Sequence, residues 1–207
     1  YGEQDIPADW RGKLGLRQRI LQLPDDLVGP PRCGKHLKED VVGSHFDNYD
    51  FVVNLAHFKG HAMGGFGGVI KNQSIGMASR EGKCLIHTAG ASRVSPWGGD
   101  QDSFLESMAE AAKGVADHFG ENILYINVMN YLSVDCDCDG NPAAPTMKDI
   151  GILASLDPVA LDQASVDLIY AAADGKDLIE RMQSRNGIHT LEHAEAIGFG
   201  SRKYELT

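Results

Sequence analysis

The sequence lacks long apolar runs, and no stretch approaches the roughly 20 residues that a membrane-spanning helix needs. It is also short of basic residues, with 19 Lys and Arg against 29 Asp and Glu and a formal net charge of −10 at pH 7. A nucleic-acid backbone would require a basic face. We therefore expect neither a membrane nor a nucleic acid as partner. The first ten residues show no signal peptide, which predicts a cytoplasmic protein.

Cysteine is scarce as well, with only Cys33, Cys84, Cys136 and Cys138 in 207 residues. Without a secretory signal, we expect reduced thiols or metal ligands and no disulfide framework. A bridge between Cys136 and Cys138 would be strained if this segment were a strand. Because three aspartates surround these two thiols, we expect weak nucleophiles unless a metal is bound.

The segment 135–140 also predicts a metal site. Thiolates favour zinc, copper(I) or iron–sulfur ligation. Cys136 and Cys138 supply only two of the usual four ligands, so another cysteine, the histidines or a second chain must join them. The segment resembles the start of a calcium loop, but its twelfth position is Thr146 and not the glutamate such a loop needs. The alternative is an acidic turn with incidental thiols.

Strands that alternate with helices predict an α/β fold with a central parallel or mixed sheet flanked by helices. We expect one core domain at residues 50–207, preceded by an irregular segment of the same domain at 1–49 that prolines and glycines interrupt. Residues 103–119 have helical apolar spacing, a capping box from Ser103 and Glu106, and a stop at Gly120. The other expected elements are strands at 51–56, 123–129 and 150–154 and helices at 158–173, 176–185 and 190–197.

The first expected strand runs directly into His57, Lys59 and His61. Imidazoles bind metals and carry protons near neutral pH, and a lysine can hold a carboxylate or a phosphate. We therefore take these three residues as candidate catalytic residues, on a loop because Gly60 follows the lysine. The alternative is a pair of structural histidines.

A glycine-rich stretch follows and ends at Lys71 and Asn72. Glycines let backbone N–H groups approach an anion, and Lys71 would complete the cradle. At least one glycine of this stretch should have positive φ. A tight crossing of the chain is the alternative. The candidate anion- or substrate-binding residues are therefore Lys71, Asn72, Gly64, Gly65, Gly67 and Gly68.

Asp157 and Pro158 predict the start of a helix. Asp162 lies in its first turns, on a helix that is otherwise largely apolar. It could hold Lys59 or Lys71, or face solvent near the positive helix end. A structural role is favoured, and Asp162 is kept as a candidate for the anion-binding group.

Taken together, these stretches resemble the uncharacterised iron–sulfur-centre proteins grouped as the domain of unknown function DUF362. The matching stretches are 57–72, 135–140 and 149–165, in the family's order. The resemblance implies an α/β domain often accompanied by ferredoxin-type clusters on Cys-x-x-Cys-x-x-Cys runs. Cys84 is the only cysteine between Asn72 and Ser103, so we expect that this insert is absent. The resemblance also implies that the N-terminal part of the family domain is missing.

Three functions follow as hypotheses. The leading one is a metal- or iron–sulfur-associated redox protein with Cys136 and Cys138 as metal ligands and an iron–sulfur cluster or zinc as cofactor. A second is a metal-free enzyme in which Lys59 and Lys71 hold a small anionic substrate and a histidine moves protons. A third is a non-catalytic binding protein. The expected partner is a small molecule or a redox protein, and an oligomer is compatible with the sequence.

Overall fold

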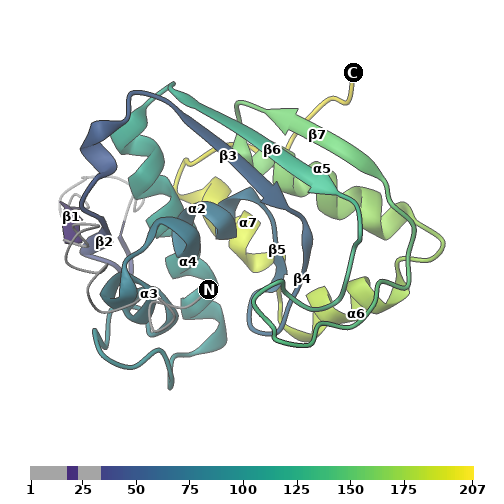
Figure 1. Cartoon of the computed structure of the whole chain (residues 1–207), viewed down its shortest axis with the longest axis horizontal. Helices are drawn as coiled ribbons and strands as arrows, with labels where there is room; N and C mark the ends of the chain where they lie inside the picture. Colours follow the sequence, from purple (N-terminus) through teal and green to yellow (C-terminus); the bar gives the residue numbers. More distant parts are fainter. Residues whose placement is uncertain (1–17, 23–33) are drawn as a thin grey trace.

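A three-stranded mixed sheet forms the centre of the fold. The computed structural model describes residues 18–22 and 34–207. The sheet has the order β3-β6-β7, in which β3 and β6 are parallel and β6 and β7 are antiparallel (Figure 1). Its strands are β3 (Val52–His57), β6 (Ile123–Met129) and β7 (Gly151–Ser155). This arrangement confirms the predicted α/β fold.

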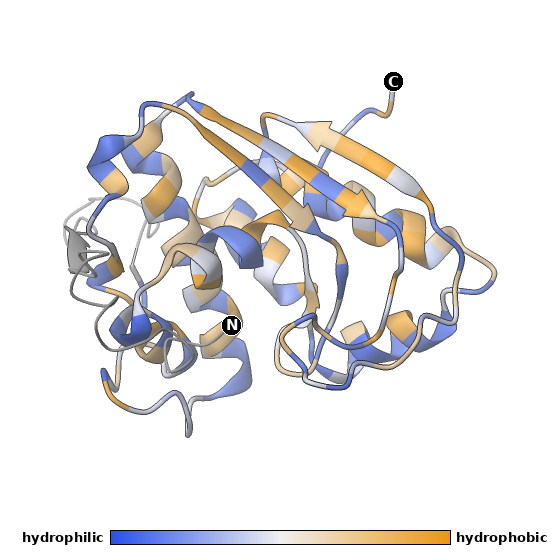
Figure 2. Ribbon diagram, in the orientation of Figure 1, coloured by the Kyte–Doolittle hydropathy of each residue, from blue (hydrophilic) through white to orange (hydrophobic). Residues whose placement is uncertain are grey.

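Helices cover one face of the sheet. The two helices that pack on the strands are α2 (Val69–Met77) and α5 (Pro158–Ala171). Behind them, α4 (Gln101–Phe119) packs against α2 and against α7 (His189–Ala196) (Figure 1). The strands of the sheet are coloured mostly as apolar in Figure 2. On the face away from the helices, Val53, Leu55 and Ile152 are 55%, 59% and 71% exposed.

Two strand pairs and three short helical elements complete the described fold. β1 pairs antiparallel with β2, and β4 pairs antiparallel with β5 directly after β3. In the part of the chain that the structure describes, none of the helices has the length and apolar character to cross a membrane. These elements are β1 (Gln18–Gln22), β2 (Glu39–Gly43), η2 (Phe46–Asn48), β4 (Lys59–His61), β5 (Gly65–Gly67), α3 (Arg80–His87) and α6 (Lys176–Ser184).

The helix predicted from residue 103 begins two residues earlier, and its predicted cap is wrong. Asp100 is the N-cap, and its carboxylate accepts a hydrogen bond from the Ser103 backbone N–H at 3.1 Å. The Glu106 side chain does not cap this helix; it contacts residues that are distant in the sequence. Gly120 ends the helix with φ of 59°, as predicted.

Several elements were not predicted. The stretch before residue 50, expected to be irregular, carries β1 and β2, and the expected loop at 57–61 is mostly strand β4. Both α2 and α3 escaped prediction because each contains a glycine, which weakens the helical signal. In α3 that glycine is required, since a Cβ at Gly82 would overlap the Val41 carbonyl of β2. Tertiary packing therefore determines which secondary structure forms in this region.

Candidate metal centre and its surroundings

The candidate site forms where two distant segments meet at the carboxyl ends of β3 and β6. Because β7 is antiparallel to β6, residues 130–150 stay at this end of the sheet. The Gly60 N–H donates to the Ser133 carbonyl at 2.8 Å. A Cβ at Gly60 would overlap the Val134 carbonyl, so glycine lets hairpin β4–β5 pack against the segment that carries the cysteines.

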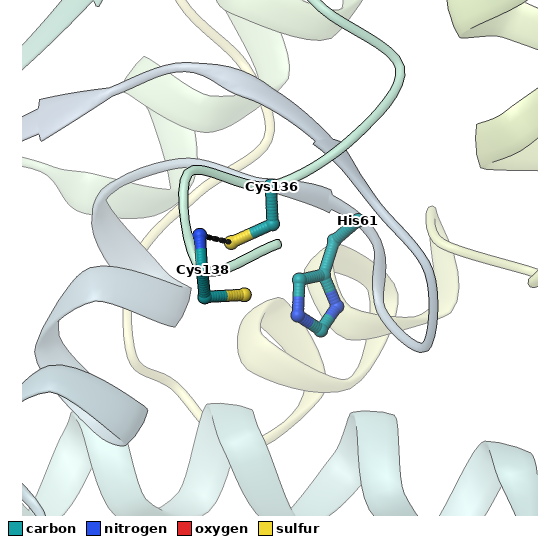
Figure 3. A group of neighbouring side chains, drawn as sticks. All are labelled: His61, Cys136 and Cys138. Atoms are coloured by element: carbon teal, nitrogen blue, oxygen red, sulfur yellow. Dashed lines mark hydrogen bonds between the residues drawn. The ribbon is translucent and has the colours of Figure 1, made fainter. Parts of the chain in front are cut away.

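That segment is a turn, which puts both thiols on one side. The Asp139 N–H donates to the Cys136 carbonyl at 2.9 Å, as in a β-turn. The Cys138 N–H donates to Cys136 Sγ at 3.3 Å (Figure 3). The strand geometry assumed for a strained bridge is therefore not the geometry found. Cys136 is buried and Cys138 is exposed.

His61 of β4 joins the two thiols. The ligand atoms of His61, Cys136 and Cys138 all lie within 4.8 Å of one another (Figure 3). A tetrahedral zinc ion, with bonds of about 2.3 Å to sulfur and about 2.0 Å to nitrogen, holds such atoms roughly 3.5–3.8 Å apart. Closing the group by about 1 Å would meet that requirement. The expectation that a histidine joins the cysteines agrees with this geometry.

The imidazole of His61 is held through one of its two ring nitrogens, Nδ1. Nδ1 accepts hydrogen bonds from the Gly64 N–H at 2.9 Å and the Met63 N–H at 3.3 Å. Burial, with help from the positive charge of Lys71, lowers the pKa of His61 to about 3, so the ring is neutral. Its proton then resides on Nε2, because Nδ1 is an acceptor. Coordination through Nε2 requires this proton to move to Nδ1, which could then no longer accept the Gly64 and Met63 N–H groups.

His57 and Lys59 point to Asp137 and not to the metal group. His57 Nδ1 lies 2.9 Å from Asp137 Oδ2, and His57 Nε2 lies 2.7 Å from the Asn130 carbonyl oxygen. Lys59 Nζ lies 3.4 Å from the same carboxylate. Although burial acts to raise it, the pKa of Asp137 is lowered by the hydrogen bond from His57 and the charge of Lys59. Two of the three candidate catalytic residues thus contact the residue between the two cysteines.

Lys71 of α2 lies beside the thiols. Burial lowers the pKa of Lys71, and negative charge on Cys136 or Cys138 acts in the opposite direction. Although Cys138 is exposed as a residue, its thiol is partly withdrawn from water, and this desolvation, followed by the neighbouring Cys136, raises its pKa to about 11. The raised pKa has the direction expected for a weak nucleophile, but its first cause is this desolvation and not the flanking aspartates.

The glycine run does not form the predicted anion cradle. Gly65 has φ of 80°, which confirms the expectation of one positive value. The N–H groups at the start of α2, however, already donate to Asp162, from Val69 at 2.9 Å and from Ile70 at 3.0 Å. A Cβ at Gly68 would overlap this carboxylate, so glycine there admits Asp162.

Asp162 is therefore a buried structural group. It neither faces solvent nor holds a lysine, whereas the structural role that was favoured agrees with its contacts. Its side chain also accepts a hydrogen bond from Asn127 Nδ2 at 2.8 Å. Burial raises the pKa of Asp162 to about 6, while the Asn127 amide and the α2 N–H groups favour the ionised form. Asn72 likewise serves packing, since its amide donates to Asn54 Oδ1 of β3 at 2.8 Å.

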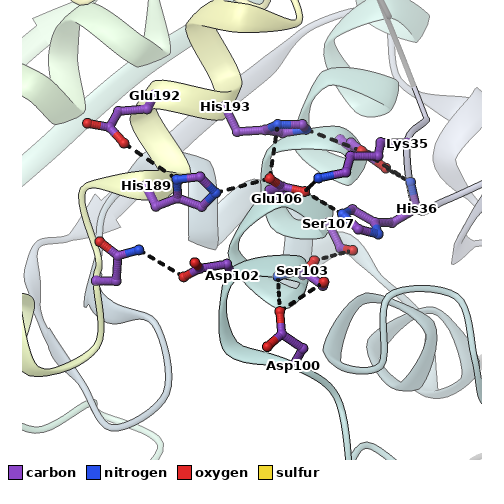
Figure 4. Close-up of polar contacts among 12 residues, drawn as sticks. Lys35, His36, Asp100, Asp102, Ser103, Glu106, Ser107, His189, Glu192 and His193 are labelled. Carbon is purple, nitrogen blue, oxygen red and sulfur yellow. Dashed lines mark hydrogen bonds and ion pairs between the residues drawn. The ribbon is translucent and has the colours of Figure 1, made fainter.

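A second polar cluster lies between α4, α7 and residues 35–37 (Figure 4). Glu106 contacts Lys35 Nζ at 2.7 Å, His189 Nε2 at 3.0 Å and His36 Nε2. These contacts make the Glu106 cluster a network of hydrogen bonds and ion pairs.

Glu110 extends this cluster one helical turn further. Its carboxylate accepts the Leu37 N–H at 2.9 Å and contacts His193 Nε2 at 3.2 Å. Sequence reasoning missed the whole network. The available signal was two glutamates four residues apart on α4 and two histidines four residues apart on α7, a spacing that places each pair on one helix face.

Comparison with known proteins gives a family but no individual relative. No curated protein and no solved structure matches the chain. One family model matches residues 14–167, which include the sheet, His61 and both cysteines of the candidate centre. The match confirms the resemblance drawn from the sequence motifs, and it carries no activity and no cofactor. The chain belongs to the family described as Domain of unknown function (DUF362).

Proposed function

We propose that the protein binds one thiophilic metal ion, zinc, through His61, Cys136 and Cys138 and uses it as the centre of an enzyme site. The observation that carries the proposal is the approach of three N and S ligand atoms to within 4.8 Å of one another. Zinc sites with three protein ligands leave a fourth position for water or substrate, which is the catalytic type. A zinc ion there supplies a Lewis acid or a metal-bound water.

The residues around the centre have defined tasks under this proposal. His57 and Lys59 fix Asp137 and thereby hold the turn that carries both thiols. Gly64 supplies the N–H that holds His61 in its present orientation, and its lack of a side chain favours the peptide rotation that coordination needs.

An iron-containing redox centre is the second candidate, because thiolate-rich donor sets also suit iron. A ferredoxin-type cluster takes four cysteines. Among the described residues, the third cysteine is Cys84 of α3, which is not part of the group, while Cys33 lies outside the described residues. This ligand count favours a single ion over a cluster.

The test is metal analysis and a visible absorption spectrum on the chain purified without oxygen and without chelators. We expect about one zinc per chain and a colourless protein, the stoichiometry of a single tetrahedral site. Exchanging Cys136 and Cys138 together for serine should abolish metal binding, whereas the matched control Cys84→Ala should retain it. Several irons per chain with acid-labile sulfide would favour the cluster. A protein that holds no metal and takes up neither zinc nor cobalt would overturn the proposal.

A further inference from the structure

Two lysines from different elements converge beside the candidate centre. Lys59 comes from β4 and Lys71 from α2, and their stems run past Gly67 of β5. A Cβ placed on Gly67 would lie 3.0 Å from Lys71 Cδ and 3.7 Å from Lys59 Cε. The absence of a side chain at position 67 therefore leaves room for both lysines on the same side of the hairpin.

Both cations are withdrawn from water, but only one has a carboxylate partner. The Lys59 side chain is 12% exposed and shares Asp137 with His57. Lys71 forms no ion pair with a carboxylate among the described residues. A buried ammonium without a partner is unfavourable, so this arrangement calls for negative charge from elsewhere.

A bound metal would increase the requirement for negative charge beside Lys71. In the metal-free protein, the groups whose negative charge would favour the ammonium form of Lys71 are Cys136, Cys138 and Asp137, with Cys136 acting most strongly. A divalent ion neutralises two thiolates, which leaves Lys71 without a counter-charge. The charge of Asp137 is already shared between His57 and Lys59. The site then carries a positive surplus in a chain whose formal net charge is −10.

We infer that Lys71, with Lys59 beside it, binds the phosphate-type dianionic head group of a small-molecule substrate next to the open position of the metal. This inference rests on the proposed metal centre. Two neighbouring ammonium groups suit a dianion better than a single carboxylate, since lysine binds phosphate as a point charge. The nearby Arg181, whose fork would suit a carboxylate, contacts the Val134 carbonyl at 2.9 Å and Asp135 at 3.2 Å.

The test uses the full chain loaded with cobalt(II), whose absorption bands report both uptake and ligand changes. Inorganic phosphate is titrated into the wild-type protein, Lys71→Gln and Lys71→Arg, with acetate as the monoanionic comparison. Lys113→Gln is the matched control, because Lys113 pairs with Asp117 at 2.7 Å on α4 and takes no part in the site.

We expect saturable spectral changes with phosphate and weaker binding of acetate. Lys71→Gln should take up cobalt normally but bind phosphate about tenfold or more weakly, as for loss of a charged hydrogen bond. Lys71→Arg should restore much of the affinity, and Lys113→Gln should match the wild type. Normal cobalt uptake with equal phosphate affinity in Lys71→Gln would overturn this inference alone. Failure of cobalt and zinc uptake would overturn the metal centre and this inference with it.

Discussion

His57 Nδ1 lies 2.9 Å from the Asp137 carboxylate, which belongs to the residue between the two cysteines. The second ring nitrogen faces the Asn130 carbonyl at 2.7 Å. The imidazole thereby bridges the end of β3 and the turn that carries Cys136 and Cys138. If the proposed metal centre forms, this histidine, which the sequence suggests as a catalytic residue, would act as a positioning residue.

Replacing His57 by alanine should weaken metal binding without abolishing it. The Asp137 side chain would keep Lys59 as its partner but lose the contact that orients the turn. Loss of such outer partners costs about 10–100-fold in metal affinity. Competition against a chromophoric zinc chelator measures the effect, with His118→Ala as the control because His118 pairs with Asp47 at 3.5 Å, away from the cysteines. Unchanged affinity in His57→Ala would contradict the positioning role.

Asp162→Asn should destabilise the fold strongly. Both carboxylate oxygens accept hydrogen bonds from N–H groups at the start of α2. The NH2 group of an asparagine would therefore face one of these N–H donors, and neither could accept. A buried donor left without an acceptor costs about 1–3 kcal/mol. Urea unfolding followed by circular dichroism should show this loss, while Asp117→Asn, at an exposed ion pair, should change stability by less than about 1 kcal/mol. Equal stabilities of the two variants would show that the hydrogen bonds from the start of α2 to Asp162 do not stabilise the fold.

The contact between Asp162 and the start of α2 also shows which features can be predicted from the sequence and which cannot. The β-branched and aromatic residues of Ile123–Met129 and the Asp157-Pro158 start of α5 are local signals, and both elements were predicted. The hydrogen bond from Val69 to Asp162 spans 93 residues, and no local pattern carries it. The sequence identified His61 and the cysteines as chemically relevant. It could not show that His57 and Lys59 turn toward Asp137, because that depends on how the β6–β7 connection packs on the hairpin.

Asp40 should make stability fall as pH rises. Among the described residues neither of its carboxylate oxygens meets the geometry of a hydrogen bond, and burial, only partly offset by the nearby Val41 backbone N–H, raises its pKa to about 7. The unfolded chain releases this proton near pH 4, so between about pH 4 and 7 the folded state binds more protons and loses stability with rising pH. Asp40→Asn should flatten this part of the profile and be more stable than the wild type at pH 8.

Urea unfolding at several pH values measures the Asp40 effect. The slope should differ between the wild type and Asp40→Asn from pH 5 to 7, and the two curves should run parallel above pH 8. Asp174→Asn serves as the control, because Asp174 is exposed and its carboxylate accepts the Lys148 N–H at 3.1 Å. Identical slopes in the wild type and Asp40→Asn would show that Asp40 is ionised in the folded protein at neutral pH.

Glu106 should have the opposite pH effect. Although burial acts to raise it, hydrogen bonds from Lys35, His36 and His189 lower the pKa of Glu106 to about 2. The unfolded chain takes up this proton near pH 4.5, so the contribution of Glu106 to stability is present above that pH and is lost as pH falls toward 2. Glu106→Gln should therefore be less stable than the wild type at pH 7 and should lose less stability on acidification. Thermal unfolding between pH 3 and 7 measures both effects, and an equal acid sensitivity in the variant would show that the network of α4, α7 and residues 35–37 does not depend on this charge.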